Sequence, residues 1–462
     1  MANKFSPAWR VREQSRLELK RTARFQAALC YPNTYAVGMS NLGIHTIYRE
    51  LNQRSDTRCE RIFSDTLVRG TYRSVESQQP LAGFDIIAIS LSYELDSQQA
   101  ADFVRSIADD PQARPVMPLV IIGGMVTTVN IRPLIPFADI IVIGEAEETL
   151  GALMDMLARH GAFATRRQKD QFLAEAAHVP AVFVPGISSD VEMLPRHVRD
   201  VNDWGCSSQI VTPHTEFSNI FLVELSRGCP WQCNFCLAGA VCGRFRPRRL
   251  DCLLPDLEAG LRLTDKVGLV AAAVSDYPQI NELLGWLQQR RARVTVSSLR
   301  AESTPEELLR CLAGSGQHSV TFAPETGSEI LRRSLRKNLK DAQLLEQCHR
   351  CRNAGMRSVK LYFMVGLPEE TPDDVAGIAR LATRCQGIIP VKLNIGIFVP
   401  KPHTVFGRQL FAGRRELGIK LSYLRRLLAK TGIPVRWASI REAEREYAIA
   451  HGDEAVLLRE QP

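Results

Sequence analysis

Residues 226–239 read SRGCPWQCNFCLAG and place three cysteines, Cys229, Cys233 and Cys236, within eight positions. The preceding segment, residues 220–226 (IFLVELS), has the apolar pattern of a buried strand. The thiols therefore follow a strand and occupy a loop. A chance cluster of core thiols explains the loop poorly, because it also contains Pro230 and Asn234.

The region that begins with this strand alternates between strand and helix patterns. Helical patterns such as INELLGWLQQRR and TPEELLRCLAGSG separate the strands. Six such units predict a partial (β/α)6 barrel, in which functional side chains lie at the carboxyl ends of the strands. The predicted strands are 220–226, 267–275, 293–299, 319–325, 358–368 and 391–400.

An earlier region, residues 20–160, also alternates between strand and helix patterns. Its strands are apolar on both faces, which predicts a Rossmann-like, doubly wound parallel sheet. Ligands of such sheets bind beyond the carboxyl ends of the strands. A ligand site and simple turn chemistry both explain the polar and glycine residues found there, namely Ser90, Ser92, Gly123, Gly124, Gly144 and Glu145.

The chain has 462 residues, which is too long for one hydrophobic core. The patterns predict an α/β protein with four parts. A Rossmann-like domain (20–160) and a linker (161–215) precede the partial barrel (216–408), and a small α-rich C-terminal appendage (409–462) packs over that barrel.

Composition excludes few functions. The net charge of +8 is a mild excess for a chain of this size. A local arginine cluster follows the cysteine loop, and it is explained either by solvation or by a grip on anionic groups. It consists of Arg244, Arg246, Arg248 and Arg249.

Neither a signal peptide nor a long apolar run is present, so we expect a cytoplasmic protein with no membrane span. Twelve cysteines in a reducing compartment favour metal or redox chemistry where they cluster and packing where they scatter. Cys30, Cys59, Cys206, Cys311 and Cys385 belong to the scattered class. The Cys348-x-x-Cys351 pair lies in a charged helical stretch and is interpreted as structural.

The cysteine loop allows two kinds of metal site. A zinc ion needs a fourth ligand, for which Cys242 and Cys206 are candidates. An iron–sulfur cubane held by three thiolates instead keeps one iron open for a small chelating molecule.

The C-x-x-x-C-x-x-C spacing, with Phe235 before its last cysteine, resembles the radical S-adenosylmethionine (radical SAM) superfamily. The segments TVSSLRAE, TFAPETGSEILRRSL, LYFMVGLPEET and NIGIFVPKPHTVFG are similar to strand ends of members that carry an N-terminal cobalamin-binding-type domain. YPNTYAVGMSNLG and FADIIVIGEAEETL resemble that domain itself. The resemblance covers roughly residues 20–455 and is closest to poorly characterised members.

The resemblance implies that Cys229, Cys233 and Cys236 ligate a 4Fe-4S cluster. The open iron would chelate SAM, which is cleaved reductively to a 5′-deoxyadenosyl radical. Phe235 would pack near the adenine. The pair Ser275 and Asp276 stands where many members have a G-G-E-like segment that binds the SAM amino group, and Asp276 would accept a hydrogen bond from that ammonium. Either SAM contacts or ordinary polar positions of the barrel mouth explain Ser297, Ser298, Arg300 and Glu325.

The resemblance also implies cobalamin in the first domain, lined by the strand-end residues named above. The D-x-H-x-x-G cobalt-binding motif is absent, and His45 does not stand in that setting. Cobalamin bound without a protein histidine and an empty vestigial domain are both compatible with this departure.

The expected function is that of a radical SAM enzyme, with cobalamin-dependent methyl transfer to an unknown small-molecule substrate as one outcome. A flavodoxin or ferredoxin would donate the electron, and nucleic acid is not excluded as a partner. The alternatives are an RNA-modifying methylthiotransferase and a non-catalytic iron–sulfur or zinc protein. The first domain's Cys30 and Cys59 are too few for the second cluster that methylthiotransferases need.

Overall fold

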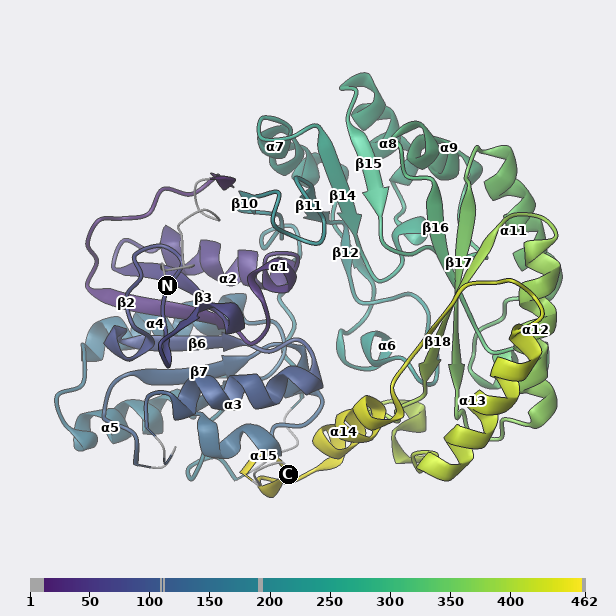
Figure 1. Cartoon of the computed structure of the whole chain (residues 1–462). Helices are drawn as coiled ribbons and strands as arrows, with labels where there is room; N and C mark the ends of the chain where they lie inside the picture. The colour runs from purple at the N-terminus through teal and green to yellow at the C-terminus, as the bar shows by residue number, and fades with distance from the viewer. Residues whose placement is uncertain (1–11, 109, 111–112, 190–193, 459–462) are drawn as a thin grey trace. The chain divides into compact units, whose positions relative to one another are not determined.

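The computed structural model describes residues 12–108, 110, 113–189 and 194–458, which fold into two compact units. The first unit comprises Met1–Val223 with Arg262–Thr264 and Ala448–Pro462. The second comprises Glu224–Leu261 and Asp265–Tyr447. Figure 1 shows that each unit is built from strands covered by helices.

A six-stranded sheet with the order β3-β2-β6-β7-β8-β9 forms the centre of the first unit. Its first five strands are parallel, and only β9 runs antiparallel to its neighbour. The first five strands follow the flavodoxin-like order, in which the chain changes direction between its first strand β2 and its third, β6. The strands are β2 (Phe25–Tyr31), β3 (Thr57–Phe63), β6 (Ile86–Ser90), β7 (Leu119–Gly123), β8 (Ile140–Val142) and β9 (Val182–Phe183).

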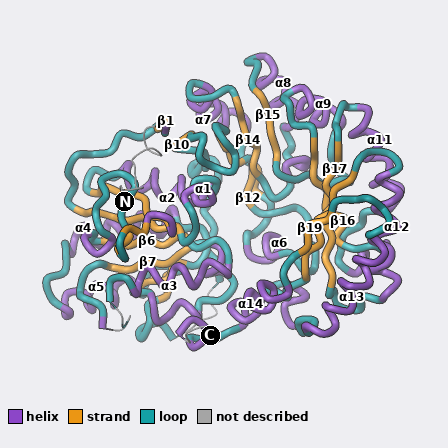
Figure 2. The backbone as a smooth tube through the Cα atoms, viewed as in Figure 1, coloured by secondary structure: helices purple, strands orange, loops and turns teal. Residues whose placement is uncertain are grey.

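Helices cover both faces of this sheet, so the predicted doubly wound fold class is confirmed (Figure 2). One core packs α2 (Leu42–Gln53), α4 (Glu147–His160) and α5 (Arg166–Ala176) against one face. The other core packs α3 (Ser97–Arg105) and the 3-10 helix η7 (Arg132–Phe137) against the opposite face. Because both faces are buried, the strands read as continuous apolar runs.

Segments expected to be a linker and a barrel appendage pack with the first unit. Within 161–215, α5 and β9 extend the layers of this unit, and β10 (Ile210–Val211) pairs with β1 (Gln14–Ser15). At the C-terminus, Ile449 in the last turn of α14 (Ile440–His451) and Leu457 of α15 (Ala455–Leu458) join the core that contains α3. Their apolar side chains explain why residues 448–458, which we expected to belong to a barrel appendage, group with the first unit.

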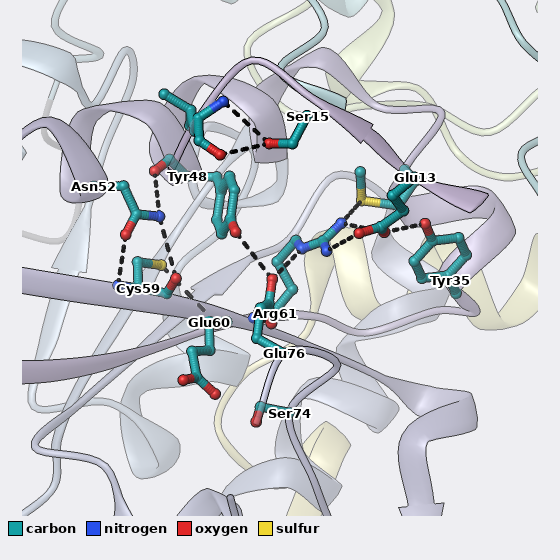
Figure 3. A network of polar contacts seen from close by, with 12 residues as sticks. Glu13, Ser15, Tyr35, Tyr48, Asn52, Cys59, Glu60, Arg61, Ser74 and Glu76 are labelled. Carbon is teal, nitrogen blue, oxygen red and sulfur yellow. Dashed lines mark hydrogen bonds and ion pairs between the residues drawn. The ribbon is translucent and has the colours of Figure 1, made fainter. Parts of the chain in front are cut away.

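The sequence did not predict strand β3, because three of the seven residues in TRCERIF are charged and they follow no strand-like alternation. Arg61 is almost fully buried, and it donates from Nε to Glu76 at 2.6 Å and from Nη2 to Glu13 at 2.8 Å. Tyr48 donates its hydroxyl to the same Glu76 carboxylate, as Figure 3 shows. Pairing of this kind makes a buried guanidinium tolerable on a sheet face.

Two sheets, β11-β14-β15 and β16-β17-β18-β19, carry the strands of the second unit, and β11 begins just before the unit boundary at Glu224. The pairs β14-β15, β16-β17, β17-β18 and β18-β19 are parallel. A hydrogen bond from the Leu299 amide to the Thr321 carbonyl joins β16 to the segment after β15. The predicted partial barrel is therefore an open one, and the tail adds β19 to it. The strands are β11 (Phe221–Glu224), β14 (Lys266–Val270), β15 (Arg293–Val296), β16 (Ser319–Glu325), β17 (Ser358–Val365), β18 (Val391–Ile397) and β19 (Val435–Trp437).

Helices connect successive strands of the second unit, as the alternating sequence pattern predicts (Figure 1). None of the helices in the described part of the chain is long and apolar enough to cross a membrane. The helices are α6 (Leu237–Val241), α7 (Leu250–Leu261), α8 (Ile280–Gln289), α9 (Glu306–Gly314), α10 (Glu329–Ser334), α11 (Asp341–Asn353), α12 (Pro372–Gln386), α13 (Arg414–Leu428) and α14 (Ile440–His451).

Replacing Glu76 with Gln should lower the free energy of unfolding of the first unit by about 3–5 kcal/mol, because it leaves the Arg61 guanidinium buried with half of its compensation. Urea unfolding followed by circular dichroism measures the change. The control is Asp155→Asn, since Asp155 is an exposed partner of Arg54, and its expected effect is below about 1 kcal/mol. Equal effects of the two changes would contradict a structural role for the buried network.

Candidate functional site

A short antiparallel ladder closes the cysteine loop. Strand β12 (Ser226–Arg227) pairs with β13 (Arg246–Pro247), so the segment between them is an excursion with fixed ends. Gly228 enters this excursion at φ +71°, and a Cβ there would approach the Arg244 carbonyl oxygen to 2.4 Å. Glycine is therefore required immediately before Cys229.

Asn234 fixes the middle of the loop to the end of α10. Its amide donates to the Leu335 carbonyl at 3.0 Å and its side chain donates to the Ser334 carbonyl at 2.6 Å. Its own carbonyl accepts the Phe406 amide at 3.0 Å. These bonds place the neighbouring Cys233 beside the segment that follows α10.

The Phe235 side chain packs against an apolar cluster in the second unit. Leu331, Leu335, Leu367 and Phe398 form this cluster. The sequence resemblance suggested a place near an adenine for Phe235. Its position in the structure gives the ring a role in anchoring the cysteine loop as well.

The three thiols are half-buried and influence one another electrostatically. Burial raises the pKa of the Cys229 thiol, the Trp231 amide lowers it, and the charge of Cys236 raises it further. Burial also raises the pKa of Cys233, while Lys337 and Arg300 lower it. Thiolates are the form that binds metals, so these two cations favour the metal-binding state.

Arg300 lies between the cysteine loop and the strand ends. Its guanidinium carbon is 4.1 Å from the centre of the Trp231 ring, and Nη2 is 2.8 Å from Glu302. A stacked, paired arginine of this kind is held in one orientation. Trp231 and Glu302 had no signal in the sequence that distinguished them from ordinary loop residues.

Ser275 and Asp276 lie in the segment after β14, and both contact Ser303. The Ser275 hydroxyl is 3.0 Å from that of Ser303, which also donates to Asp276 at 3.1 Å. The charge of Asp276 reaches Cys229 and raises its pKa. Ser297 and Ser298 are exposed, so the structure does not bring them into this group of interacting side chains.

Glu325 and Lys337 form an ion pair at the end of β16. The Lys337 ammonium is 2.8 Å from Glu325 Oε1, and the exposed fractions of the two side chains are only 8% and 12%. Glu325 follows a register shift in the strand and has φ +71°. A non-glycine residue in this conformation is strained by about 1–3 kcal/mol, and such strain is concentrated at functional sites.

The other candidates near the loop have structural partners. Arg248 is buried and binds Asp256 and the Cys252 carbonyl, Arg249 binds Asp251, and Arg246 binds the Cys242 carbonyl. In the described residues, no group of three or more His, Cys, Asp or Glu side chains is placed to hold a single metal ion. The ligands of a cubane bind different irons, so that finding concerns single-ion sites.

Two further predicted features are structural. Cys348, Cys351 and Cys385 are buried between α11 and α12. Burial raises the pKa of Cys351 to about 12, which makes its thiol inert. His45 is buried as well, with its ring nitrogens at 3.1 Å from the Met39 carbonyl and the Gln209 amide.

The strand-end residues of the first unit divide into two groups. Ser90 and Ser92 lie at the end of β6, on one side of the point where the strand order reverses. A Cβ on Gly124 would lie 2.4 Å from the Leu91 carbonyl oxygen, and one on Gly144 would lie 2.3 Å from that of Arg196. Close packing within the protein therefore explains these two glycines. Gly123 ends β7, and Glu145 binds the Val198 amide at 2.7 Å.

A polar cluster lies at the same reversal point, which the sequence did not predict. The Tyr31 hydroxyl contacts Ser92 and Asn41, and Asn33 donates to Asp96 at 2.9 Å. Burial raises the pKa of Asp96 to about 6. Ligands of flavodoxin-like sheets bind at this place, so the cluster is the candidate ligand site of the first unit.

Two protein families match this chain, one in each of its two parts. Residues 43–185 match the family described as "Radical SAM proteins, N-terminal", and residues 223–382 match "Radical SAM superfamily". An uncharacterized protein of Methanocaldococcus jannaschii is 28% identical over 435 residues, covering 92% of this chain and 88% of that protein. Cytidylyl-2-hydroxyethylphosphonate methyltransferase of Streptomyces wedmorensis is 28% identical over 166 residues, which cover 34% of this chain and 30% of that enzyme.

Two solved structures share the fold. The radical SAM methyltransferase TsrM from Kitasatospora setae, with cobalamin and a [4Fe-4S] cluster bound, has a TM-score of 0.59 at 14% identity, covering 84% of this chain and 77% of that one. The cobalamin-dependent radical enzyme OxsB has a TM-score of 0.55 at 16% identity, covering 90% of this chain and 58% of that one. The two family matches lie one after the other along this chain, and the chain shares its fold with these two structures. The protein therefore belongs to the radical SAM superfamily of enzymes.

Proposed function

We propose that Cys229, Cys233 and Cys236 hold a 4Fe-4S cluster whose open iron binds SAM. When bound, this cluster supplies the electron that cleaves SAM to a 5′-deoxyadenosyl radical. The observation that carries the proposal is the convergence of three half-buried thiols on one loop with fixed ends, next to Arg300 and Lys337. A one-electron donor such as flavodoxin or ferredoxin would supply the reductant.

The residues beside the loop suit the amino-acid part of SAM. Asp276 accepts one hydrogen bond from Ser303 and has further acceptor sites for an ammonium group. Arg300 is suited to a carboxylate, because its guanidinium is oriented by Trp231 and Glu302. These side chains would orient SAM, and the surrounding barrel would exclude water from the radical. Ser275, Glu325 and Phe235 would contribute indirectly, through the contacts described above.

We further propose that the first unit binds cobalamin at the reversal point between β2 and β6. Ser90, Ser92, Tyr31 and Asn33 supply neutral polar groups there, and Asp96 supplies a carboxyl group. His45 is engaged on both ring nitrogens, so this binding would not use it as a cobalt ligand. The names of two similar structures include cobalamin, which supports the proposal.

With both cofactors, methyl transfer to a small molecule is the reaction that the site supports best. A partial relative in Streptomyces wedmorensis is named as a methyltransferase of a phosphonate. That likeness covers a third of this chain, so it supports the reaction class more than the substrate. An unactivated carbon or a phosphorus atom is the acceptor we propose.

The methylthiotransferase alternative has no observation in its favour. Cys59 and Cys30 belong to the cores on opposite faces of the first sheet. Cys206 contacts the Thr46 hydroxyl and the Leu42 carbonyl. These three thiols are therefore not placed to share a second cluster. A simple electron carrier or zinc module would not need the polar groups that lie around Asp276 and Arg300.

Single alanine replacements of Cys229, Cys233 and Cys236 should each reduce the iron content of anaerobically reconstituted protein to near zero. Each change removes one of three ligands from a cluster that has no fourth protein ligand. The matched control is Cys242→Ala, which should keep the wild-type iron content. Iron and acid-labile sulfide per chain provide the measurement, and an essential Cys242 would instead favour a four-ligand site.

Reduced wild-type enzyme should convert SAM to 5′-deoxyadenosine, which chromatography of the reaction products measures.

Protein prepared with cobalamin should keep the visible absorption spectrum of cobalamin after gel filtration. Ser90→Leu should lower the retained cobalamin at least about tenfold without loss of iron, because it fills the end of β6 with an apolar side chain. Ser106→Leu is the control, since Ser106 is the C-cap of α3 and is not among the residues proposed to bind cobalamin. A wild-type cluster without cobalamin would refute methyl transfer by this route.

A further inference from the structure

Backbone contacts fix the placement of the Glu325–Lys337 pair relative to the cysteine loop. Asn234 binds the carbonyls of Ser334 and Leu335, and Lys337 follows two residues later. The Lys337 amide in turn binds the Arg332 carbonyl at 2.9 Å, which holds this turn against α10. Cys233 and Lys337 are therefore carried by two segments that are bonded together.

The pair lies beside the cysteine loop, because Lys337 follows by two residues the Leu335 carbonyl that accepts the Asn234 amide. Its two charges are opposite, so they act in opposite directions on a charged group held by the loop. Both side chains are nearly buried, so solvent screens their fields only weakly. Glu325 has a left-handed backbone after a register shift in β16, and its Oε1 lies 2.8 Å from the Lys337 ammonium.

We propose that the Glu325–Lys337 pair sets the reduction potential of the cluster bound by the cysteine loop. The proposal rests on the proposed function. A cluster ligated by three thiolates is negatively charged and becomes more so when it gains one electron from a reductant. A nearby cation stabilises the reduced state more than the oxidised one, and a nearby anion does the opposite. The step is the transfer of one electron, with no bond broken.

The two members of the pair therefore have opposite effects on one measurable quantity. Lys337 raises the potential, which eases reduction, and Glu325 limits that rise while holding the ammonium in place. A purely structural ion pair would behave differently, because losing either member would affect stability and leave the potential unchanged. The sign of the effect separates the two roles.

The test is a potentiometric titration of the reconstituted protein, monitored by electron paramagnetic resonance in the absence of SAM. Lys337→Gln should lower the ratio of reduced to oxidised cluster at a fixed potential by about tenfold, which corresponds to 59 mV for a one-electron couple. Glu325→Gln should move the potential in the opposite direction. Lys337→Arg should stay near wild type, because it keeps the charge.

Arg310→Gln is the control, since Arg310 is exposed on α9 and pairs with Glu306 and Glu307. It should leave the potential unchanged. If Lys337→Gln loses iron, Glu325→Gln still gives the sign of the effect, and Lys337→Arg shows whether the positive charge alone maintains the potential. Equal potentials, or shifts of Lys337→Gln and Glu325→Gln in the same direction, would overturn the inference. Absence of a cluster from wild-type protein would instead refute the proposed function itself.

Discussion

The hydrogen bonds that join Asn234 to the end of α10 are the constraint on which the geometry of the site depends. Between Gly228 and Cys236 the loop has no helix or strand of its own, and its internal bonds, such as that from the Cys236 amide to the Cys233 carbonyl at 3.1 Å, do not attach it to the rest of the unit. Bonds to two successive carbonyls fix Asn234, and its neighbours Cys233 and Phe235 are then oriented together. The site is therefore held by α10, an element about a hundred residues away in sequence.

This docking also explains the electrostatics of the site. Partial burial raises the pKa of Cys229 and Cys233, which opposes the thiolate form. Arg300 and Lys337 oppose that effect, and each is itself paired with a glutamate, because an unpaired cation would be destabilising at this depth. The arrangement supplies positive potential at the thiols while keeping the local net charge small. Two paired cations thus favour the thiolate form, whereas unpaired cations at the same depth would destabilise the fold more.

The sequence predicts those parts of the fold that follow from local patterns. The apolar strands β2, β6, β7 and β16–β18 were predicted, and so was the cysteine loop, because its three thiols are close in sequence. Strand β3 was missed because its Arg61 depends on Glu13 and Glu76, which come from other segments. Trp231, Ser303 and Lys337 were missed for the same reason, since only the folded chain brings them beside the loop.

The glycines at the strand ends of the first unit show where local patterns are ambiguous. A glycine after a parallel strand is required both when a ligand approaches the backbone and when the chain's own backbone does. At Gly124 and Gly144 the approaching groups are the carbonyls of Leu91 and Arg196, so the protein itself explains them. The reversal between β2 and β6 follows from strand order, which no single segment encodes. The polar residues that gather at this reversal, including Tyr31 and Asp96, could be identified only after the order of the strands was known.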